Sequence, residues 1–496
     1  MEFEKIAQQL RSEAVPESDA NTTVYARSVL KHEGVSLIMV RRGLHRYLVV
    51  VGDGRLYDAL EGQVYDGYKV APANHENRLV LNTYFPHTAP QAFGKQVATF
   101  GLGDRLGLAG PGHLKALLDR DVKPVLAQQS IRELNLTGRD YRQVMDAASY
   151  AVIQEGYTGG YGADGDHLKL EDDIQMSLAL GFTMLTLDCS DHIRNDVEQM
   201  DEHEIAQAYS ELPRDVRDRL EKRFLGRSFT IGGHSFEYDQ SSLQKNALIY
   251  GEAVRYMVYI YDRHIKHAAR AVDFEISIDE TMTPTAPEAH YFVARELYDH
   301  GVDIFSMAPR FCGEFQKGID YIGDIAQFER ELALHAEIAD HFGYKLSIHS
   351  GSDKFSVFPI IGKYTNGRFH VKTAGTSWLE AVRTVATVNP QLYRRMHRYA
   401  LEHFEEAKAY YHVTTEISRI KPLNDVSDAD LPAYMDDDNA RQLIHITYGI
   451  LLQAKDENGQ SMFKDEFFKT LIEQETTYEA SLVQHIGRHL TLLGKA

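Results

Sequence analysis

The sequence predicts an α/β protein whose core is a (β/α)8 barrel of the TIM type, with a small β-rich N-terminal element, helical insertions and a C-terminal helical layer. Three observations predict this fold: short apolar runs recur along the middle of the chain, helical patterns separate them, and eight such units fit within roughly 280 residues. Short buried strands that alternate with helices pair in parallel and are covered on both faces. Eight units over that length favour a closed barrel over a doubly wound sheet.

The predicted barrel strands are seven apolar runs and one weaker, glycine-rich stretch. The seven runs are Val97–Gly101, Pro124–Ala127, Met184–Asp188, Asp273–Ile278, Asp303–Met307, Lys345–His349 and Phe369–Thr373, and the weaker stretch is Tyr157–Gly162. Apolar residues at helical spacing predict the intervening helices at His113–Arg120, Tyr141–Gln154, Leu170–Leu180, Glu288–Asp299 and Ile325–His341.

Three further segments accompany this core, which we place at residues 93–380. Residues 1–92 form the β-rich element, because the runs Val35–Val40 and Tyr47–Val51 flank a glycine-containing hairpin turn. A helical insertion occupies about residues 195–270 within the core, and residues 381–496 form a helical layer packed on the barrel.

Composition argues against several classes of function. The formal net charge of −19 argues against a nucleic-acid partner, because phosphate binding needs clustered Lys and Arg. The two cysteines, Cys189 and Cys312, exclude a disulfide scaffold and fit a reducing compartment. No run approaches the roughly 20 apolar residues of a membrane span, and the start of the chain lacks the pattern of a signal peptide. We therefore expect a cytoplasmic protein that acts on a small molecule, with no membrane partner.

In such a barrel, catalytic residues lie where the strands end and the following loops begin. Residues 159–165 include four glycines, and the stretch continues into an Asp-x-Asp-His-x-Lys pattern that contains Asp166 and His167. Glycine permits backbone conformations closed to other residues, so this stretch can deliver both side chains to a site. The alternative is a solvent loop in which Asp166 caps the helix near Leu170.

Two other predicted strands place polar residues at the barrel interior. At residues 274–280 a period of two puts Glu275, Ser277 and Asp279 on one face and the apolar residues on the other. A carboxylate inside a barrel is costly unless it binds a metal, pairs with a cation or performs chemistry, although a solvated strand face is the alternative for Glu275. His349 ends a strand beside a Gly-Ser-rich loop, which favours a metal ligand over a satisfied core histidine.

Two segments are candidates for binding an anionic group. Arg105 lies shortly before Gly110–His113, where a helix can begin and offer free backbone N–H groups. Lys372 lies among hydroxyl residues just before another helix, a place where barrels often bind a phosphate or carboxylate. We expect Arg105 and Lys372 to bind a substrate carboxylate, with purely structural turns as the alternative. The sequence has no P-loop, G-x-S-x-G or H-E-x-x-H motif, which argues against P-loop nucleotide, serine-hydrolase and zincin chemistry.

The segments at residues 100–107, 159–169, 274–280 and 347–354 together resemble the bacterial tagaturonate/fructuronate epimerases, and the resemblance extends from about residue 90 to the C-terminus. It implies a metal-dependent enzyme that interconverts D-tagaturonate and D-fructuronate in hexuronate catabolism. It also implies roles for individual residues: Asp166 and Glu275 as the catalytic acid–base pair, and His167, Gln316 and His349 as metal ligands.

The metal implied by this resemblance is a divalent cation of intermediate softness. Two imidazole ligands favour Zn²⁺, Mn²⁺ or Ni²⁺ over Ca²⁺ or Mg²⁺. The partner is then a small sugar acid. The sequence is compatible with a homo-oligomer.

Three alternative functions remain. A metal-dependent sugar aldolase or ketol isomerase could use the same barrel, and a glycoside hydrolase could use Asp166 and Glu275 as its carboxylate pair. A carbohydrate-binding or regulatory protein would bind without turnover.

An epimerase of this kind has two routes, because the inverted carbon is β to the ketone and simple enolisation does not acidify its C–H bond. One is retro-aldol cleavage and re-addition. The other is direct proton exchange between Asp166 and Glu275 on opposite faces of the substrate. We favour the retro-aldol route.

Overall fold

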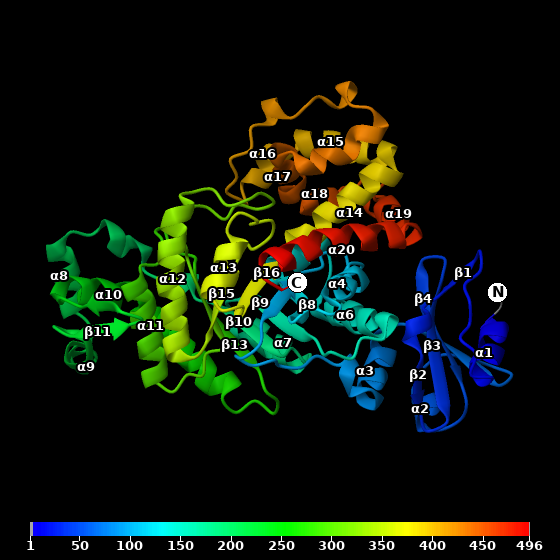
Figure 1. Cartoon of the computed structure of the whole chain (residues 1–496), viewed down its shortest axis with the longest axis horizontal. Coiled ribbons are helices and arrows are strands. Elements are labelled where there is room, and N and C mark those ends of the chain that lie inside the picture. The colour runs from blue at the N-terminus through cyan, green and yellow to red at the C-terminus, as the bar shows by residue number, and fades with distance from the viewer. Residues whose placement is uncertain (1–2, 496) are drawn as a thin grey trace.

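The computed structural model describes residues 3–495, and its centre is a closed barrel of eight parallel strands (Figure 1). The strands neighbour one another in the order β10-β13-β14-β15-β16-β7-β8-β9. Their bounds are β7 Thr99–Leu102, β8 Lys123–Ser130, β9 Gly162–Leu168, β10 Met184–Asp188, β13 Asp273–Ile278, β14 Ser306–Pro309, β15 Lys345–Ile348 and β16 Phe369–Thr373. The predicted barrel is confirmed.

The strand β9 lies later in the chain than predicted. It begins at Gly162, where the predicted Tyr157–Gly162 ends, so the Asp-x-Asp-His pattern is part of a strand and not of a loop. The high glycine content suggested a loop, but Gly165 serves the strand, because a Cβ there would lie 2.9 Å from Cδ1 of Leu168. Asp164 and Asp166 flank Gly165 and therefore both face the barrel interior. Asp166 does not cap the next helix, whose N-cap residue is Leu170.

Helices cover the outside of the barrel, close to where the sequence predicts them. The helices that follow the strands are α4 Gly110–Leu117, α5 Ile131–Thr137, α6 Tyr141–Glu155, α7 Glu171–Ala179, α10 Gln240–Ile260, α11 Pro287–Asp299, α12 Ile325–Phe342, α13 Phe358–Tyr364 and α14 Gly375–Val388. The start of α6 shows why the local sequence is helical: Asp140 accepts a hydrogen bond from the backbone of Gln143, and the Gln143 side chain bonds back.

The N-terminal element is built on a small antiparallel sheet, as the sequence predicts, and it also contains the three helices α1, α2 and α3. Five strands follow the order β1-β3-β4-β6-β5, and β2 pairs with β3. The bounds are α1 Phe3–Arg11, β1 Thr22–Val24, β2 Leu30–His32, β3 Val35–Arg42, β4 His45–Val51, α2 Arg55–Ala59, β5 Gln63–Tyr65, β6 Tyr68–Pro72 and α3 His75–Tyr84. The two predicted strands are the central hairpin β3–β4, whose turn uses Gly43 at φ 60°.

The insertion projects from the side of the barrel away from the N-terminal sheet (Figure 1). Besides the expected helices it contains a two-stranded hairpin. Its elements before α10 are α8 Glu202–Ser210, α9 Arg214–Phe224, β11 Ser228–Ile231 and β12 His234–Glu237. None of the helices in the described part of the chain combines the length and apolarity that a bilayer crossing requires.

The C-terminal helices form a layer that packs on the barrel and on α14 (Figure 1). They are α15 Pro390–Glu402, α16 Phe404–Lys408, α17 Asp438–Ile446, α18 Tyr448–Gln453, α19 Lys464–Glu473 and α20 Glu475–Leu492. Trp378 of α14 is fully buried, and its ring centroid lies 5.2 Å from that of Phe467 in α19. Residues 1–2 of the predicted N-terminal element and residue 496 of the predicted C-terminal layer lie outside the described residues. The predicted limits of the three segments, at residues 92 and 380, stay predictions.

Candidate active site

A cavity of about 470 Å³ lies where the barrel strands end and their loops begin. It is lined by five of the seven site residues predicted from the sequence: Arg105, Asp166, His167, His349 and Lys372. Glu275 and Gln316 do not line it. The side chains that line the cavity come from both halves of the barrel, which agrees with a site built from the C-terminal ends of many strands.

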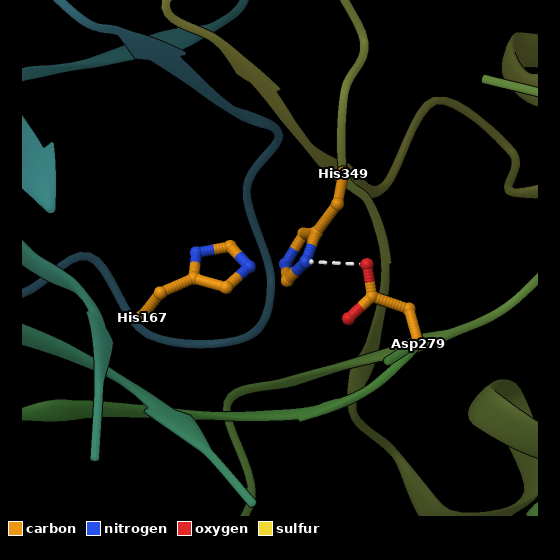
Figure 2. Close-up of side chains that lie close together, drawn as sticks. All are labelled: His167, Asp279 and His349. Carbon is orange, nitrogen blue, oxygen red and sulfur yellow. Dashed lines mark hydrogen bonds and ion pairs between the residues drawn. The ribbon is translucent and has the colours of Figure 1, made fainter. Parts of the chain in front are cut away.

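Two imidazoles and a carboxylate converge in this cavity (Figure 2). The ring centroids of His167 and His349 are 4.7 Å apart, and Nδ1 of His349 lies 3.1 Å from Oδ2 of Asp279. One potential ligand atom from each of the three residues lies within 4.8 Å of the other two. His167, the second-last residue of β9, takes a left-handed φ of 52°, which is uncommon for a residue other than glycine.

These three residues fit a divalent metal. The Nδ1 atom of His167 lies 2.8 Å from Oδ1 of Asp166, the carboxylate–imidazole contact that orients ligating histidines and leaves Nε2 for the metal. Burial disfavours a charged His349, but Asp279 and Glu275 raise the pKa of this imidazole to about 10. The local field therefore stabilises a positive charge between the carboxylates, and two imidazoles with one carboxylate suit Zn²⁺, Mn²⁺ or Ni²⁺.

The ammonium group of Lys372 joins three carboxylates. Its Nζ lies 2.8 Å from Asp164, 2.7 Å from Asp166 and 2.8 Å from Glu275, and it also donates to Thr186. Burial alone would lower the pKa of Lys372, but the three carboxylates hold it well above its usual value. Lys372 also lines the cavity, so a substrate carboxylate there would compete with these three carboxylates for its charge.

The pKa values of the three carboxylates around Lys372 are shifted in different directions. Burial raises the pKa of Asp164 to about 6 against the effect of Lys372. Burial acts in the same direction on Asp166, but Lys372 and His167 hold its pKa well below the usual value. Asp166 also lines the cavity, so it is an ionised base that a substrate can reach.

Glu275 faces the interior, as the strand pattern predicts, but lies beneath the cavity. It is fully buried, with one oxygen 2.8 Å from Nε2 of His349 and the other accepting from Ser306. Burial opposes its charge, but Lys372 is the first of the cations that keep its pKa well below the usual value. The strand alternation placed Asp279 on the same face as Glu275, and no signal in the sequence indicated that Asp279 would contact His349.

Comparison with known proteins identifies the family. The family model for UxaE, tagaturonate epimerase, matches residues 25–493. The chain belongs to the tagaturonate epimerase family. It is 42% identical over 475 residues to the tagaturonate/fructuronate epimerase of Thermotoga maritima, covering 95% of this chain and 96% of that protein. Family membership makes the chain an isomerase, as the sequence predicts.

Solved structures of a relative have the same fold. The native crystal structure of fructuronate-tagaturonate epimerase UxaE from Cohnella laeviribosi is similar at 62% identity and a TM-score of 0.95, covering 100% of this chain and 99% of that one. A structure of the same protein with one glycerol bound gives the same identity and TM-score, covering 99% of each chain.

Two of the residues predicted for the site of this epimerase have other partners in the structure. The amide oxygen of Gln316 accepts hydrogen bonds from Thr414 and Gln442 in the C-terminal region. A metal-ligand role for Gln316 would require these bonds to break. The sequence could not reveal this, because all of these partners lie about a hundred residues further along the chain.

Arg105 lines the cavity of the epimerase, but part of its charge is already neutralised. Its Nη2 lies 2.8 Å from Oε1 of Glu133, and its guanidinium carbon lies 3.8 Å from the ring centroid of Tyr448. Burial alone would lower the pKa of Arg105. Tyr448 and Glu133 outweigh this effect and hold the pKa above its usual value. Only Nη1 is left without a partner among the described residues.

The two predicted anion-binding helix starts differ in position. The first residues of α4 do not line the cavity, whereas Ala374 and Gly375 at the start of α14 do. The residue at the N-cap of α14, Ala374, provides no side-chain cap, so the first backbone N–H groups of this helix are available. Of the two segments, the one at residues 371–377 therefore fits the expectation of an anion site.

A second cluster of potential ligands, Asp353, His485 and His489, lies outside this cavity. Arg441 and His485 each bond one oxygen of Asp353, and Nε2 of His489 accepts the backbone N–H of Asp353 at 3.0 Å. Because a guanidinium and a backbone donor already occupy these ligand atoms, the cluster is an ion-pair network rather than a metal centre.

Proposed function

We propose that this chain interconverts D-tagaturonate and D-fructuronate with the help of one divalent metal. The observation that supports it best is the convergence of His167, His349 and Asp279 beside the ionised Asp166 in one cavity. The relatives in Thermotoga maritima and Cohnella laeviribosi are both named as epimerases of these two sugar acids. The reaction then belongs to hexuronate catabolism in the cytoplasm.

In this proposal His167, His349 and Asp279 hold the metal. When bound, the cation supplies Lewis-acid polarisation of substrate oxygens. Asp166 orients His167 through its contact with Nδ1, and Glu275 orients His349 through its contact with Nε2. In this proposal Glu275 does not touch the substrate. It acts from beneath the cavity by positioning His349 and Lys372, which both line it.

The proposed chemistry is retro-aldol cleavage followed by re-addition. Asp166 takes the proton of the hydroxyl group on the β carbon, whose oxygen becomes the aldehyde oxygen of a three-carbon acid. The bond between the α and β carbons breaks, and its electron pair remains on the α carbon as an enediolate. The aldehyde rotates, the bond re-forms on its other face, and Asp166 returns the proton.

The arrangement of the carboxylates supports this route over direct C–H exchange. Direct exchange needs an acid and a base on opposite faces of the inverted carbon. Asp166 and Glu275 instead bond the same Nζ of Lys372, so they converge on one point on one side of the cavity. One ionised carboxylate at the cavity surface is sufficient to move a hydroxyl proton.

Isotope exchange tests the chemistry. D-Tagaturonate is incubated with the enzyme in D2O, and the product is analysed by proton NMR. We expect D-fructuronate with hydrogen retained at the inverted carbon, and deuterium there would refute the retro-aldol route. The Asp166→Asn variant, which lacks the proposed base, should lose turnover.

Product analysis separates the remaining enzyme class. A metal-dependent aldolase would release two three-carbon fragments and leave them apart, whereas an epimerase recombines them. Metal analysis of the same preparation should give one divalent ion per chain, and a chelator should abolish turnover. Full activity in a metal-free preparation would contradict the metal proposal.

A further inference from the structure

Several buried polar atoms around the cavity have no hydrogen-bond partner within residues 3–495. They are Nη1 of Arg105, Oε1 of Gln128, Oε2 of Glu133 and both ring nitrogens of His445. Buried polar groups in folded proteins are nearly always hydrogen-bonded. A group of exceptions around one cavity therefore indicates the polar groups of a ligand.

The chemistry of these unpaired atoms matches a polyhydroxy acid. Arg105 can only donate, the oxygens of Gln128 and Glu133 can only accept, and a neutral imidazole does one of each. A sugar acid presents a carboxylate that accepts and hydroxyl groups that both donate and accept. All the unpaired atoms can therefore be satisfied by one substrate of this class.

His445 is the member of this set that comes from outside the barrel. It belongs to α17 of the C-terminal layer, and its ring lies against the first residue of α14. A Cβ atom at Gly375 would lie 1.8 Å from Cε1 of His445, so glycine at this position leaves the space that the ring occupies. Gly375 and His445 both line the cavity.

The surroundings of His445 keep its ring neutral. Burial first, and then the nearby charges of Arg105 and Lys317, hold its pKa well below the usual value. A neutral ring has one N–H donor and one nitrogen acceptor. That pair suits a hydroxyl group, which also donates and accepts, better than it suits a carboxylate.

We infer that His445 binds a hydroxyl group of the sugar acid, so that the C-terminal layer completes the substrate site of the barrel. The inference rests on the proposed function for the identity of the ligand. His445 lies outside both the predicted site residues and the cluster of His167, Asp279 and His349. Arg105, through its free Nη1, is then the neighbouring donor for the carboxylate.

The test uses three variants of the full-length enzyme. His445→Leu removes both nitrogens, and His445→Gln restores one donor and one acceptor. His397→Leu is the matched control. His397 is a fully buried histidine of α15 in the same layer, and its Nε2 also has no hydrogen-bond partner among the described residues. Unlike His445, it does not line the cavity.

The dissociation constant for D-fructuronate is measured by calorimetry, together with kcat and KM for D-tagaturonate. We expect His445→Leu to weaken binding about tenfold, the effect of losing hydrogen bonds to a buried partner, with a smaller change in kcat. His445→Gln should recover most of the affinity, and His397→Leu should bind as the parent does.

An unchanged dissociation constant in His445→Leu would overturn the inference, as would an equal loss in His397→Leu, which would indicate a general effect on folding. Turnover of the parent enzyme decides the proposed function separately. If the parent binds D-fructuronate without epimerising it, the function fails, while the ratio of dissociation constants still decides the role of His445.

Discussion

Replacing Lys372 by methionine tests whether its charge neutralises the carboxylates of the barrel or binds substrate. Methionine has nearly the same length but no charge, so Asp164, Asp166 and Glu275 would be left together in a buried space. Removing one partner of a buried ion pair costs about 3–5 kcal/mol of folding free energy, because the remaining charge is uncompensated. We expect Lys372→Met to be destabilised by at least that amount.

The barrel contains a matched control in Lys345. This lysine is also fully buried on a barrel strand, but its Nζ donates to the backbone oxygen of Val97 at 3.0 Å and to Oγ1 of Thr99 at 2.9 Å. Burial lowers the pKa of Lys345 to about 7, so its charge is not held as that of Lys372 is. Losing two neutral partners costs about 1–3 kcal/mol, so Lys345→Met should be the milder variant.

Denaturant unfolding of the parent and both variants gives the comparison. The double variant Lys372→Met/Asp164→Asn should recover part of the lost stability, because one of the three carboxylates is then neutral. The reasoning fails if Lys372→Met is no less stable than Lys345→Met. It also fails if Lys372→Met folds normally and only raises KM, which is the behaviour of the substrate-binding lysine that the sequence suggests.

Three further predictions concern the metal, the substrate carboxylate and pH. Asp279→Asn should lower metal affinity more than Gln316→Ala, measured by metal content after dialysis, and the reverse order would restore Gln316 as the third ligand. Arg105→Met, combined with Glu133→Gln to avoid an unpaired charge, should raise KM for the sugar acid about tenfold relative to Glu133→Gln alone, consistent with the loss of one charged hydrogen bond; an equal KM in the two would place the carboxylate elsewhere. Asp353 and Glu380 raise the pKa of His485 against burial, so its contribution to stability is present below about pH 6.5 and is lost as pH rises through the folded-state pKa. His485→Gln should therefore be more destabilising at pH 6 than at pH 9, and an equal loss at both would contradict an ionised His485.

The sequence predicted the barrel because its strands are short, apolar and separated by helices. It misplaced β9, because the glycines of that segment suggested a loop, whereas Gly165 is needed to let Leu168 pack. Period-two alternation correctly placed Glu275 in the barrel interior. The pattern gives the direction of a side chain but not its depth, so it could not show that Glu275 lies beneath the cavity.

Contacts between distant segments were outside the reach of the sequence. Lys372 and Arg105 looked like free cations because their acidic partners lie on other strands or helices. Gln316 looked available because its partners Thr414 and Gln442 are in the C-terminal layer. A charged residue in a motif shows what a site could bind, but only the fold shows whether another residue already binds it.

The C-terminal layer therefore does more than cover the barrel. Arg441 of α17 and His485 of α20 bond Asp353, which lies four residues after His349. The same layer bonds Gln316 in the preceding loop, and these bonds restrain both loops beside the cavity. Since α17 contains both Arg441 and His445, one helix connects the position of the His349 loop with the proposed substrate contact. The contact to the loop after His349 and the proposed substrate contact therefore lie one helical turn apart on α17.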